Sequence, residues 1–379
     1  MKICAIICEF NPFHNGHQYL INEARKFSGC DYLLCIMSGS FTQRGEIAML
    51  DKYERARHAI SGGADCVIEL PTPFAISPAE IFAEGAIKIL SAIPEVSHIA
   101  FGCENAKFDF LNAAKKLSSE SEEFKKELGE NLSAGLSYIK SYALAAEKVL
   151  GIDISKPNTI LGLEYAKAIL KLKANIEILP IARKGADYND SALHENFSSA
   201  SAIRGDISNP LVKSNVPSFV TFEGVSDLEE YKRLARLALF ETNDFKDICG
   251  IGEGLENRLK SLEYLPYDKL LTEATTSRYS TSRIRRILCA NLLKIKNSEI
   301  RSYLSEDLYI KVLAVKKASA EVLSKISKAE YPVVSDGNGK NLKGAALSCF
   351  EKDAYSYSLF NFINKKPYPR KGYDYMITV

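Results

Sequence analysis

The sequence lacks any apolar run long enough to cross a bilayer, and neither end resembles a lipidation motif. An apolar stretch does begin at Ile3 and end at Cys8, but an acidic residue and a turn follow at once, with no small-residue cleavage site. This stretch therefore predicts a strand and not a signal peptide. We expect a cytoplasmic protein with no membrane partner.

Paired Cys-x-x-Cys motifs and His clusters at zinc-binding spacing are also absent. The nine cysteines are scattered, mostly inside apolar segments, and their odd number argues against a disulfide framework. We expect buried, reduced thiols and no metal site. The cysteines are Cys4, Cys8, Cys30, Cys35, Cys66, Cys103, Cys249, Cys289 and Cys349.

A strong excess of either charge is missing as well. The formal net charge is +2 and the pI is near 7.9, so any nucleic-acid-binding surface must be a local patch. No internal repeat or low-complexity tract is present. With 379 residues, 46% of them hydrophobic and 25% charged, the chain is expected to form two or three globular domains.

The first two hundred residues alternate short apolar runs with amphipathic stretches, which is typical of an α/β fold with a parallel sheet covered by helices. The apolar runs predict strands at residues 3–8, 32–37, 66–70, 98–101 and 176–182. The amphipathic stretches predict helices at residues 16–27, 51–61, 79–91 and 108–128. Continuous apolar strands indicate a sheet that is buried on both faces.

From about Leu228 the apolar spacing changes to that of helices, and strand signals become scarce. The segment 208–227 contains Pro210, Pro217, Gly224 and several Ser and Asn residues, which favours a linker. We therefore expect a catalytic α/β domain at residues 1–207, a linker at 208–227 and a mostly α-helical, partly basic domain at 228–379. The tail at residues 365–375 mixes basic and aromatic residues and predicts either an ordered arm or a loose end.

A short motif between the first predicted strand and the first predicted helix carries the chemistry. In an open parallel sheet, ligands bind beyond the carboxyl ends of the strands, where a helix N-terminus offers backbone N–H groups to phosphates. Asn11-Pro12 predicts the turn, and Gly16 would let a phosphate approach the backbone. His14 and His17 would face one phosphate as donors and stabilise developing charge without a covalent intermediate. The alternative is that these two histidines, of only five in the chain, are surface residues or helix caps.

The segment His14-Asn15-Gly16-His17 matches the His-x-Gly-His signature of the nucleotidyltransferase and class I aminoacyl-tRNA synthetase superfamily, whose members have a Rossmann-like (HUP) fold. More narrowly, the chain resembles the tRNA(Met) cytidine acetate ligase family. This resemblance extends to about residue 290 and is carried by EFNPFHNGHQYL, IMSGSFTQRGEIAMLDKYERA, ADCVIELPTPFAISPAEIFAEGA, FGCE, KPNTILGLEYAKAI and SRYSTSRIRRIL. The family implies activation of acetate by ATP to acetyl-adenylate, then acetylation of the wobble cytidine amine of elongator tRNA(Met).

The resemblance also implies a set of ATP-binding residues. These are Ile7, Cys8, Glu9, Phe10, Asn11, Pro12, Phe13, His14, Asn15, Gly16, His17, Gln18, Tyr19, Leu20, Gly102, Asn158, Arg183 and Lys184. Independently, Gly102 ends a predicted strand and could pack against adenine or ribose, or could be a turn glycine. Asn158 could contact a base or ribose, or cap a helix. Arg183 follows the last predicted strand, where it could bind phosphate, or it could be a surface charge.

Ser199-Ala200-Ser201-Ala202-Ile203-Arg204 is similar to the second phosphate-binding motif of adenylyltransferases. Ser199, Ser201 and Arg204 could hold the β- and γ-phosphates, although the same segment could be a plain helix cap. Two positions depart from the family pattern: Ser201 stands where Thr is expected, and Asn189 stands where His is expected. Arg44, between two glycines after the second predicted strand, is a further candidate for closing over phosphate or RNA.

Residues 276–301 contain seven Lys or Arg residues against one Glu. Ile284, Ile287, Leu288 and Leu292 form an apolar stripe, which leaves a basic face suited to RNA phosphates. The candidate tRNA-binding residues are Arg278, Arg283, Arg285 and Arg286. A charged run of this kind can also be an ordinary solvated helix face.

Two other functions remain open at this point: a small-metabolite adenylyltransferase of the nicotinate or pantetheine nucleotide type, and a non-catalytic, nucleotide-dependent RNA-binding protein. The long C-terminal extension favours a macromolecular substrate and so disfavours the metabolite adenylyltransferase. The paired histidines argue against the non-catalytic RNA-binding protein. Mg²⁺ is expected from pyrophosphate chemistry alone, because the sequence shows no carboxylate cage for it.

Overall fold

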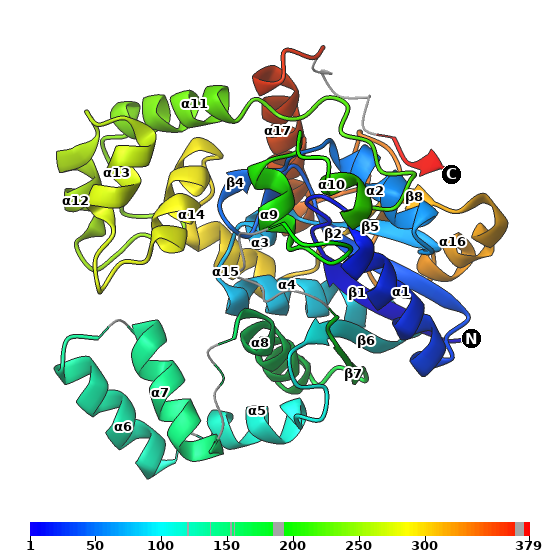
Figure 1. Cartoon of the computed structure of the whole chain (residues 1–379), viewed down its shortest axis with the longest axis horizontal. Coiled ribbons are helices and arrows are strands. Elements are labelled where there is room, and N and C mark those ends of the chain that lie inside the picture. The colour runs from blue at the N-terminus through cyan, green and yellow to red at the C-terminus, as the bar shows by residue number, and fades with distance from the viewer. Residues whose placement is uncertain (120, 137, 152–153, 155, 185–192, 368–374) are drawn as a thin grey trace.

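The computed structural model describes residues 1–119, 121–136, 138–151, 154, 156–184, 193–367 and 375–379 (Figure 1). Its centre is a mostly parallel sheet with helices on both faces, as the sequence predicted. The strand order is β10-β8-β5-β2-β1-β6-β7, and β9 pairs with β8. Those strands are β1 (Ile3–Cys8), β2 (Tyr32–Ser38), β5 (Cys66–Leu70), β6 (Val96–Cys103), β7 (Glu177–Ala182), β8 (Ile310–Val315), β9 (Val333–Val334) and β10 (Ile377–Thr378).

All five predicted strands are confirmed, and the pairs that join β5, β2, β1, β6 and β7 are all parallel. A separate antiparallel hairpin consists of β3 (Phe41–Thr42) and β4 (Glu46–Ile47). Because the chain begins at β1, extends to β2 and β5 on one side, and then crosses to β6 and β7 on the other, the strand order reverses between β1 and β6. Ligands of open α/β sheets bind at such a reversal.

The helices of the first half are α1 (Asn15–Ser28), α2 (Lys52–Ser61), α3 (Thr72–Ala75), α4 (Ala79–Ser91), α5 (Phe110–Ser118), α6 (Glu122–Ser133), α7 (Tyr138–Leu150), α8 (Pro157–Leu172) and α9 (Ala200–Gly205). The predicted helices at 16–27, 51–61 and 79–91 are confirmed as α1, α2 and α4. The single helix predicted at 108–128 is wrong. It is divided into α5 and α6, because the Ser121 hydroxyl accepts the Phe124 N–H and starts a new helix.

The remaining helices are α10 (Val212–Asn215), α11 (Leu228–Glu241), α12 (Leu255–Leu262), α13 (Tyr267–Ala274), α14 (Thr281–Leu292), α15 (Asn297–Ser305), the 3-10 helix η1 (Lys317–Ser319), α16 (Glu321–Ile326) and α17 (Gly344–Ile363). Helices α11 to α14 lie together at one side of the sheet (Figure 1). They form a core of their own, which also contains Phe41 and Ile47 from the β3-β4 hairpin. The expected change to helical structure near Leu228 is thus confirmed.

Alternate residues of the central strands enter two different cores. In β1, Ile3 and Ile7 pack toward α4, α5 and α8, whereas Cys4 and Ile6 pack toward α1 and α2. Burial on both faces explains why these strands are continuously apolar. All nine cysteines are buried free thiols.

The sequence did not predict β8, β9 and β10, which come from the last seventy residues and complete the main sheet. Strand β8 pairs antiparallel with β5, while β9 and β10 are only two residues long. Strands so short carry no readable alternation. Segment 208–227 also packs on the α/β part through Val212, Val216 and Val220. The proposed division into domains stays a prediction.

A buried ionic cluster joins β5, α2, β8 and α17. The Nζ of Lys52 lies 2.9 Å from Glu69 Oε2, and the Nζ of Lys311 lies 3.7 Å from the same oxygen. Asp353 completes the cluster by accepting the Thr72 N–H and the Tyr309 hydroxyl. Burial raises the pKa of Glu69, but Lys52 and Lys311 outweigh it and lower that pKa below its usual value. The C-terminal helix is therefore attached beside the Lys52–Glu69–Lys311 ion pairs through the two hydrogen bonds of Asp353.

Replacing Glu69 by Gln is expected to destabilise the protein by about 3 to 5 kcal/mol, because the buried Lys52 and Lys311 would lose the carboxylate that they share. Urea unfolding followed by circular dichroism measures the change. Glu130→Gln on α6 is the matched control: its ion pair with Lys126 is exposed, so a loss below about 1 kcal/mol is expected. Equal losses in both variants would contradict the interpretation of the cluster.

Candidate nucleotide-binding site

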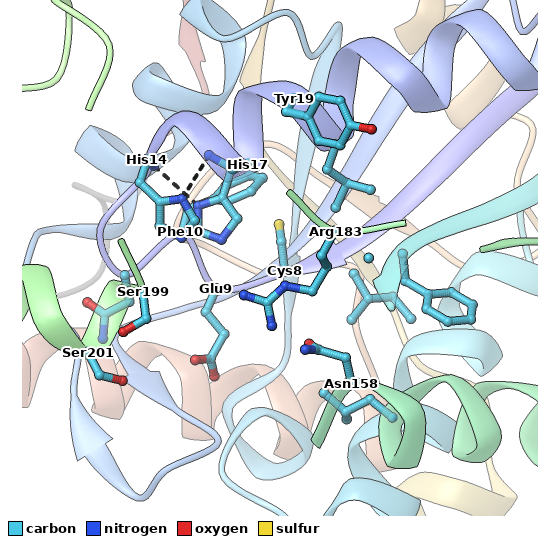
Figure 2. Close-up of a pocket in the computed structure, with 18 of the residues that line it drawn as sticks. Cys8, Glu9, Phe10, His14, His17, Tyr19, Asn158, Arg183, Ser199 and Ser201 are labelled. Carbon is cyan, nitrogen blue, oxygen red and sulfur yellow. Dashed lines mark hydrogen bonds between the residues drawn. The ribbon is translucent and has the colours of Figure 1, made fainter. Parts of the chain in front are cut away.

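A pocket lies at the carboxyl ends of β1, β6 and β7, where the strand order reverses (Figure 2). The turn at Asn11-Pro12 leads from β1 to the first helix, and its peptide bond is cis. The side chain of Asn11 accepts the Met49 N–H at 2.7 Å, while its carbonyl accepts Nη1 of Arg204 at 2.5 Å. The turn is thereby held from two other parts of the chain.

His14 and His17 lie against each other at the start of α1, with ring centroids 3.7 Å apart. His14 is the N-cap residue, and its Nδ1 accepts the Gly16 N–H at 3.0 Å. Nδ1 of His17 accepts the His14 N–H at 3.3 Å (Figure 2). The capping alternative and the phosphate-facing prediction are therefore compatible, because each ring caps the helix with Nδ1 and keeps Nε2 for another partner.

Both imidazoles are neutral at physiological pH. Burial lowers the pKa of His14 to about 3, with the Arg183 and Arg204 guanidiniums contributing. Burial, together with His14 and Arg183, also lowers the pKa of His17. Because a neutral imidazole carries one proton and Nδ1 is the acceptor in both rings, that proton is on Nε2. The site thus offers two uncharged N–H donors.

Position 16 requires a glycine because of a close contact that the sequence did not reveal. A Cβ at this position would lie 2.8 Å from Cε1 of His14, so any side chain would displace the capping imidazole. Gly102 is similar, because its Cβ would lie 3.2 Å from Cγ of Arg183. It belongs to β6 and not to a turn, so the turn-glycine alternative is wrong.

Glu104, which the sequence analysis did not assign, holds two of the candidate residues. Its Oε1 accepts Nδ2 of Asn158 at 2.8 Å and lies 3.9 Å from Nη1 of Arg183. Its Oε2 accepts the Thr159 hydroxyl at 3.0 Å. Asn158 lies within the first turn of α8, whose N-cap is Lys156, so the helix-cap alternative for Asn158 is wrong. Glu104 thereby orients an amide and a guanidinium at one side of the pocket.

Ser199, Ser201 and Arg204 all line the pocket. Figure 2 shows Ser199 and Ser201 on the side opposite Asn158. Ser199 is the N-cap of α9, and its hydroxyl accepts the Ala202 N–H at 3.1 Å, so it also serves as a cap. The pocket consequently has serine hydroxyls and a helix start at one side and Asn158 at the other, and Figure 2 shows the imidazole pair on the serine side.

Most of the predicted ATP-binding residues are brought together here. The lining includes Ile7, Cys8, Glu9, Phe10, Asn11, His14, Gly16, His17, Tyr19, Leu20, Gly102, Asn158, Arg183 and Lys184. Pro12, Phe13, Asn15 and Gln18 are not part of it. Phe13 is fully buried, and Asn15 donates to the Asn196 and Ser214 carbonyls. Asn189 lies outside the described residues, as do residues 368–374 of the tail.

Several lining residues were not predicted. Phe82, Leu161 and Tyr165 come from α4 and α8 and form an apolar wall. No local signal distinguishes them from ordinary core residues, because only the packing of two helices brings them to the strand ends. Gln43 comes from the β3-β4 turn, together with Arg44, which the sequence did single out.

That hairpin turn connects the pocket to the helical part. The Gln43 N–H donates to Glu9 Oε1 at 2.7 Å, on the pocket side. On the other side, a Cβ at Gly45 would lie 2.4 Å from the backbone nitrogen of Arg286, and the Tyr231 hydroxyl donates to the Gly45 carbonyl at 2.8 Å. The hairpin therefore packs directly on α14.

Basic residues in and just before α14 form ion pairs with acidic side chains that the sequence did not suggest. Arg283 lies 2.8 Å from Glu253, and Arg285 lies 2.9 Å from Glu46. Burial lowers the pKa of Arg286 to about 10. Arg278 lies 4.0 Å from Glu253, with its side chain 63% exposed, and is the most accessible of the four candidates. The predicted basic face is thus partly neutralised by acids of the protein itself.

No group of three or more His, Cys, Asp or Glu side chains among the described residues is placed to hold a metal ion. Among the same residues, no helix combines the length and apolar character that a membrane span requires.

The chain is similar to known proteins over nearly its whole length. The family model described as HIGH nucleotidyl transferase matches residues 1–374. The tRNA(Met) cytidine acetate ligase of Clostridium botulinum strain Hall is 38% identical over 392 residues, covering 95% of each chain. The enzyme of the same name from Caldanaerobacter subterraneus is 36% identical over 386 residues, covering 96% of each.

Two solved structures of Thermotoga maritima TmcAL cover 100% of both chains at 29% identity. The apo form has a TM-score of 0.91, and the form bound with alpha-thio ATP has a TM-score of 0.89.

Nitrogen-15 NMR of the imidazoles tests the protonation derived above. In the free protein, His14 and His17 are expected to remain neutral Nε2–H tautomers from pH 8 down to pH 5, because their folded-state pKa values are lowered and protonation sets in only in stronger acid. The variants His14→Asn and His17→Asn assign the signals. Protonation of either ring near pH 6.5, or an Nδ1–H tautomer, would show that the capping geometry is wrong.

Proposed function

Because the chain belongs to the tRNA(Met) cytidine acetate ligase family of HIGH nucleotidyl transferases, we propose that it activates acetate with ATP and acetylates the wobble cytidine of elongator tRNA(Met). Acetate attacks the α-phosphorus, acetyl-adenylate forms and pyrophosphate leaves. The exocyclic amine of the cytidine then takes the acetyl group to give N4-acetylcytidine, and AMP is released. We propose the cytoplasm as the location of this reaction, because its substrate would be a tRNA.

One observation carries the proposal: two neutral Nε2–H donors are fixed at a helix N-terminus between Arg183 and the Ser199–Arg204 end of the pocket. Donors held in this way need no reorganisation when charge develops on phosphate oxygens. Both imidazoles use Nδ1 for the backbone, so neither can act as a nucleophile through that atom. The arrangement therefore suits direct displacement at phosphorus without a covalent enzyme intermediate.

We assign the parts of ATP along the pocket by chemistry. Asn158 and Arg183, oriented by Glu104, hold the adenosine end, and Gly102 leaves room for the Arg183 stem. The imidazole pair holds the α-phosphate. Ser199, Ser201 and Arg204 receive the departing pyrophosphate, where hydroxyls, helix N–H groups and a guanidinium favour an anion.

ATP enters this scheme as its magnesium complex. Glu9 is the one acidic side chain among the described lining residues, so the pocket provides no carboxylate cage. Mg²⁺ commonly keeps several of its waters and binds substrate phosphates, so the ion would be held mainly by the phosphate oxygens of ATP. The metal neutralises phosphate charge when it is bound.

The helical part is the proposed tRNA-binding region. Arg278, just before α14, is exposed in this region. Helix α14 packs on the β3-β4 hairpin, whose turn reaches the pocket. The two relatives match over nearly the whole chain and not only over the α/β part, which disfavours a metabolite adenylyltransferase. A non-catalytic RNA-binding protein would not need two pre-oriented N–H donors at a phosphate site.

An assay of both half-reactions tests the function. Purified protein with ATP, magnesium and labelled acetate is expected to exchange pyrophosphate into ATP, and to acetylate tRNA(Met) when the tRNA is added. His17→Asn should lower acetate-dependent exchange about 100- to 1,000-fold, the usual cost of removing one such donor. Exchange that depends on a nicotinate or pantetheine nucleotide in place of acetate would refute the proposal.

Arg278→Ala is expected to weaken tRNA binding about uniformly across sequences and to reduce the salt dependence of binding by about one phosphate contact. Filter binding at several salt concentrations measures both effects. The control is Lys126→Ala on α6, another exposed cation, which should leave affinity and slope unchanged. If Arg278→Ala behaves like the control, Arg278 is not part of the RNA-binding surface.

A further inference from the structure

The second half of the proposed reaction requires a proton acceptor, and this inference rests on that proposed function. When the exocyclic amine of cytidine attacks the acetyl carbonyl, a C–N bond forms and the bond from the acyl carbon to the phosphate oxygen breaks. AMP leaves with that electron pair, and the nitrogen must lose one proton. The imidazole pair cannot take the proton at Nδ1, because Nδ1 of each ring already accepts a backbone N–H.

Most of the other ionisable residues that line the pocket cannot serve as the proton acceptor. Arg44, Arg183, Lys184 and Arg204 are cations and have no basic lone pair at neutral pH. Burial raises the pKa of the Cys8 thiol, which therefore stays protonated, and its Sγ lies 3.6 Å from the Ile36 carbonyl. The phenols of Tyr19 and Tyr165 are weak bases in their neutral form. One carboxylate remains, that of Glu9.

Glu9 is held firmly in the pocket. It follows β1 directly, and its carbonyl accepts Nη1 of Arg55 at 2.7 Å. Its Oε1 accepts the Gln43 N–H at 2.7 Å, which holds one oxygen of the carboxylate in place. In Figure 2 the side chain points away from the imidazole pair, toward the part of the pocket between Ser201 and Asn158. The carboxylate therefore lies in the same pocket as the proposed α-phosphate site, on the side that faces away from the imidazole rings.

We propose that the Glu9 carboxylate accepts the proton that the cytidine amine loses when it attacks acetyl-adenylate. The carboxylate becomes a carboxylic acid as the amide forms and AMP departs, and it returns the proton to water after product release. Glu9 is then a catalytic residue of acetyl transfer and not a phosphate ligand. A carboxylate and a triphosphate repel each other, because both are negatively charged. A function of Glu9 in acetyl transfer therefore explains why the pocket contains a carboxylate.

The surroundings of Glu9 suit this chemistry. Burial raises its pKa above the ordinary value, which makes it a stronger base than an exposed carboxylate. The Gln43 N–H and the guanidiniums of Arg204, Arg44 and Arg55 act in the opposite direction and favour the ionised form. These cations come from α9, from the β3-β4 turn and from α2. The neighbouring residue in the chain, Cys8, carries a neutral thiol.

Glu9→Gln separates the half-reactions. Glutamine keeps an oxygen for the Gln43 N–H but cannot take a proton. Acetyl transfer from preformed acetyl-adenylate to tRNA(Met), measured in a single turnover, is expected to fall about 100-fold, a typical general-base contribution. Acetate-dependent pyrophosphate exchange should fall far less. In the unmodified protein the transfer rate is expected to rise with pH through one titration, displaced upward from the ordinary glutamate pKa, and this inflection disappears in Glu9→Gln. Glu9→Asp should restore part of the rate.

Glu104→Gln is the matched control, since Glu104 orients Asn158 and Arg183. It should raise the KM for ATP and slow exchange and transfer together. If Glu9→Gln also slows both steps by the same factor, leaves transfer unchanged, or keeps the pH inflection, Glu9 is not the proton acceptor. If the unmodified protein shows no acetate-dependent exchange at all, the proposed function itself is refuted, and this inference with it.

Discussion

The site depends on two hydrogen bonds in which backbone N–H groups donate to the Nδ1 atoms of His14 and His17. These bonds start α1, fix both ring orientations and leave the remaining proton of each ring on Nε2. Gly16 is required because a side chain there would collide with His14. One local geometry thus determines the helix start, the tautomers and the donors that the pocket presents to an anion.

The rest of the fold brings other parts of the chain to this point. The strand order reverses between β1 and β6, so their carboxyl ends and that of β7 contribute Glu9, Gly102 and Arg183 to one pocket. The β3-β4 turn lies between the pocket and α14, and Tyr231 with Gly45 attaches it to the helical core. Within the proposed function, this hairpin joins the nucleotide site to the RNA-binding part.

The sequence alone predicted the five central strands and the motif at the end of β1, because continuous apolar strands and a motif at a strand end are local signals. Most of the other pocket residues were implied by the family resemblance. It did not predict β8 to β10, whose pairing with β5 and with each other is set by long-range packing. Glu104 was missed for the same reason, since its partners Asn158 and Arg183 are distant in the chain. The ion pairs of Arg283 and Arg285 with Glu253 and Glu46 also have no sequence signature.

The most direct test of the central claim is a crystal structure of this protein with a non-hydrolysable ATP analogue. Nε2 of His14 and of His17 should lie about 3 Å from oxygens at the α-phosphate, with the terminal phosphates at Ser199 and Arg204. A nucleotide bound elsewhere, or imidazoles turned so that Nδ1 faces the phosphate, would contradict the account.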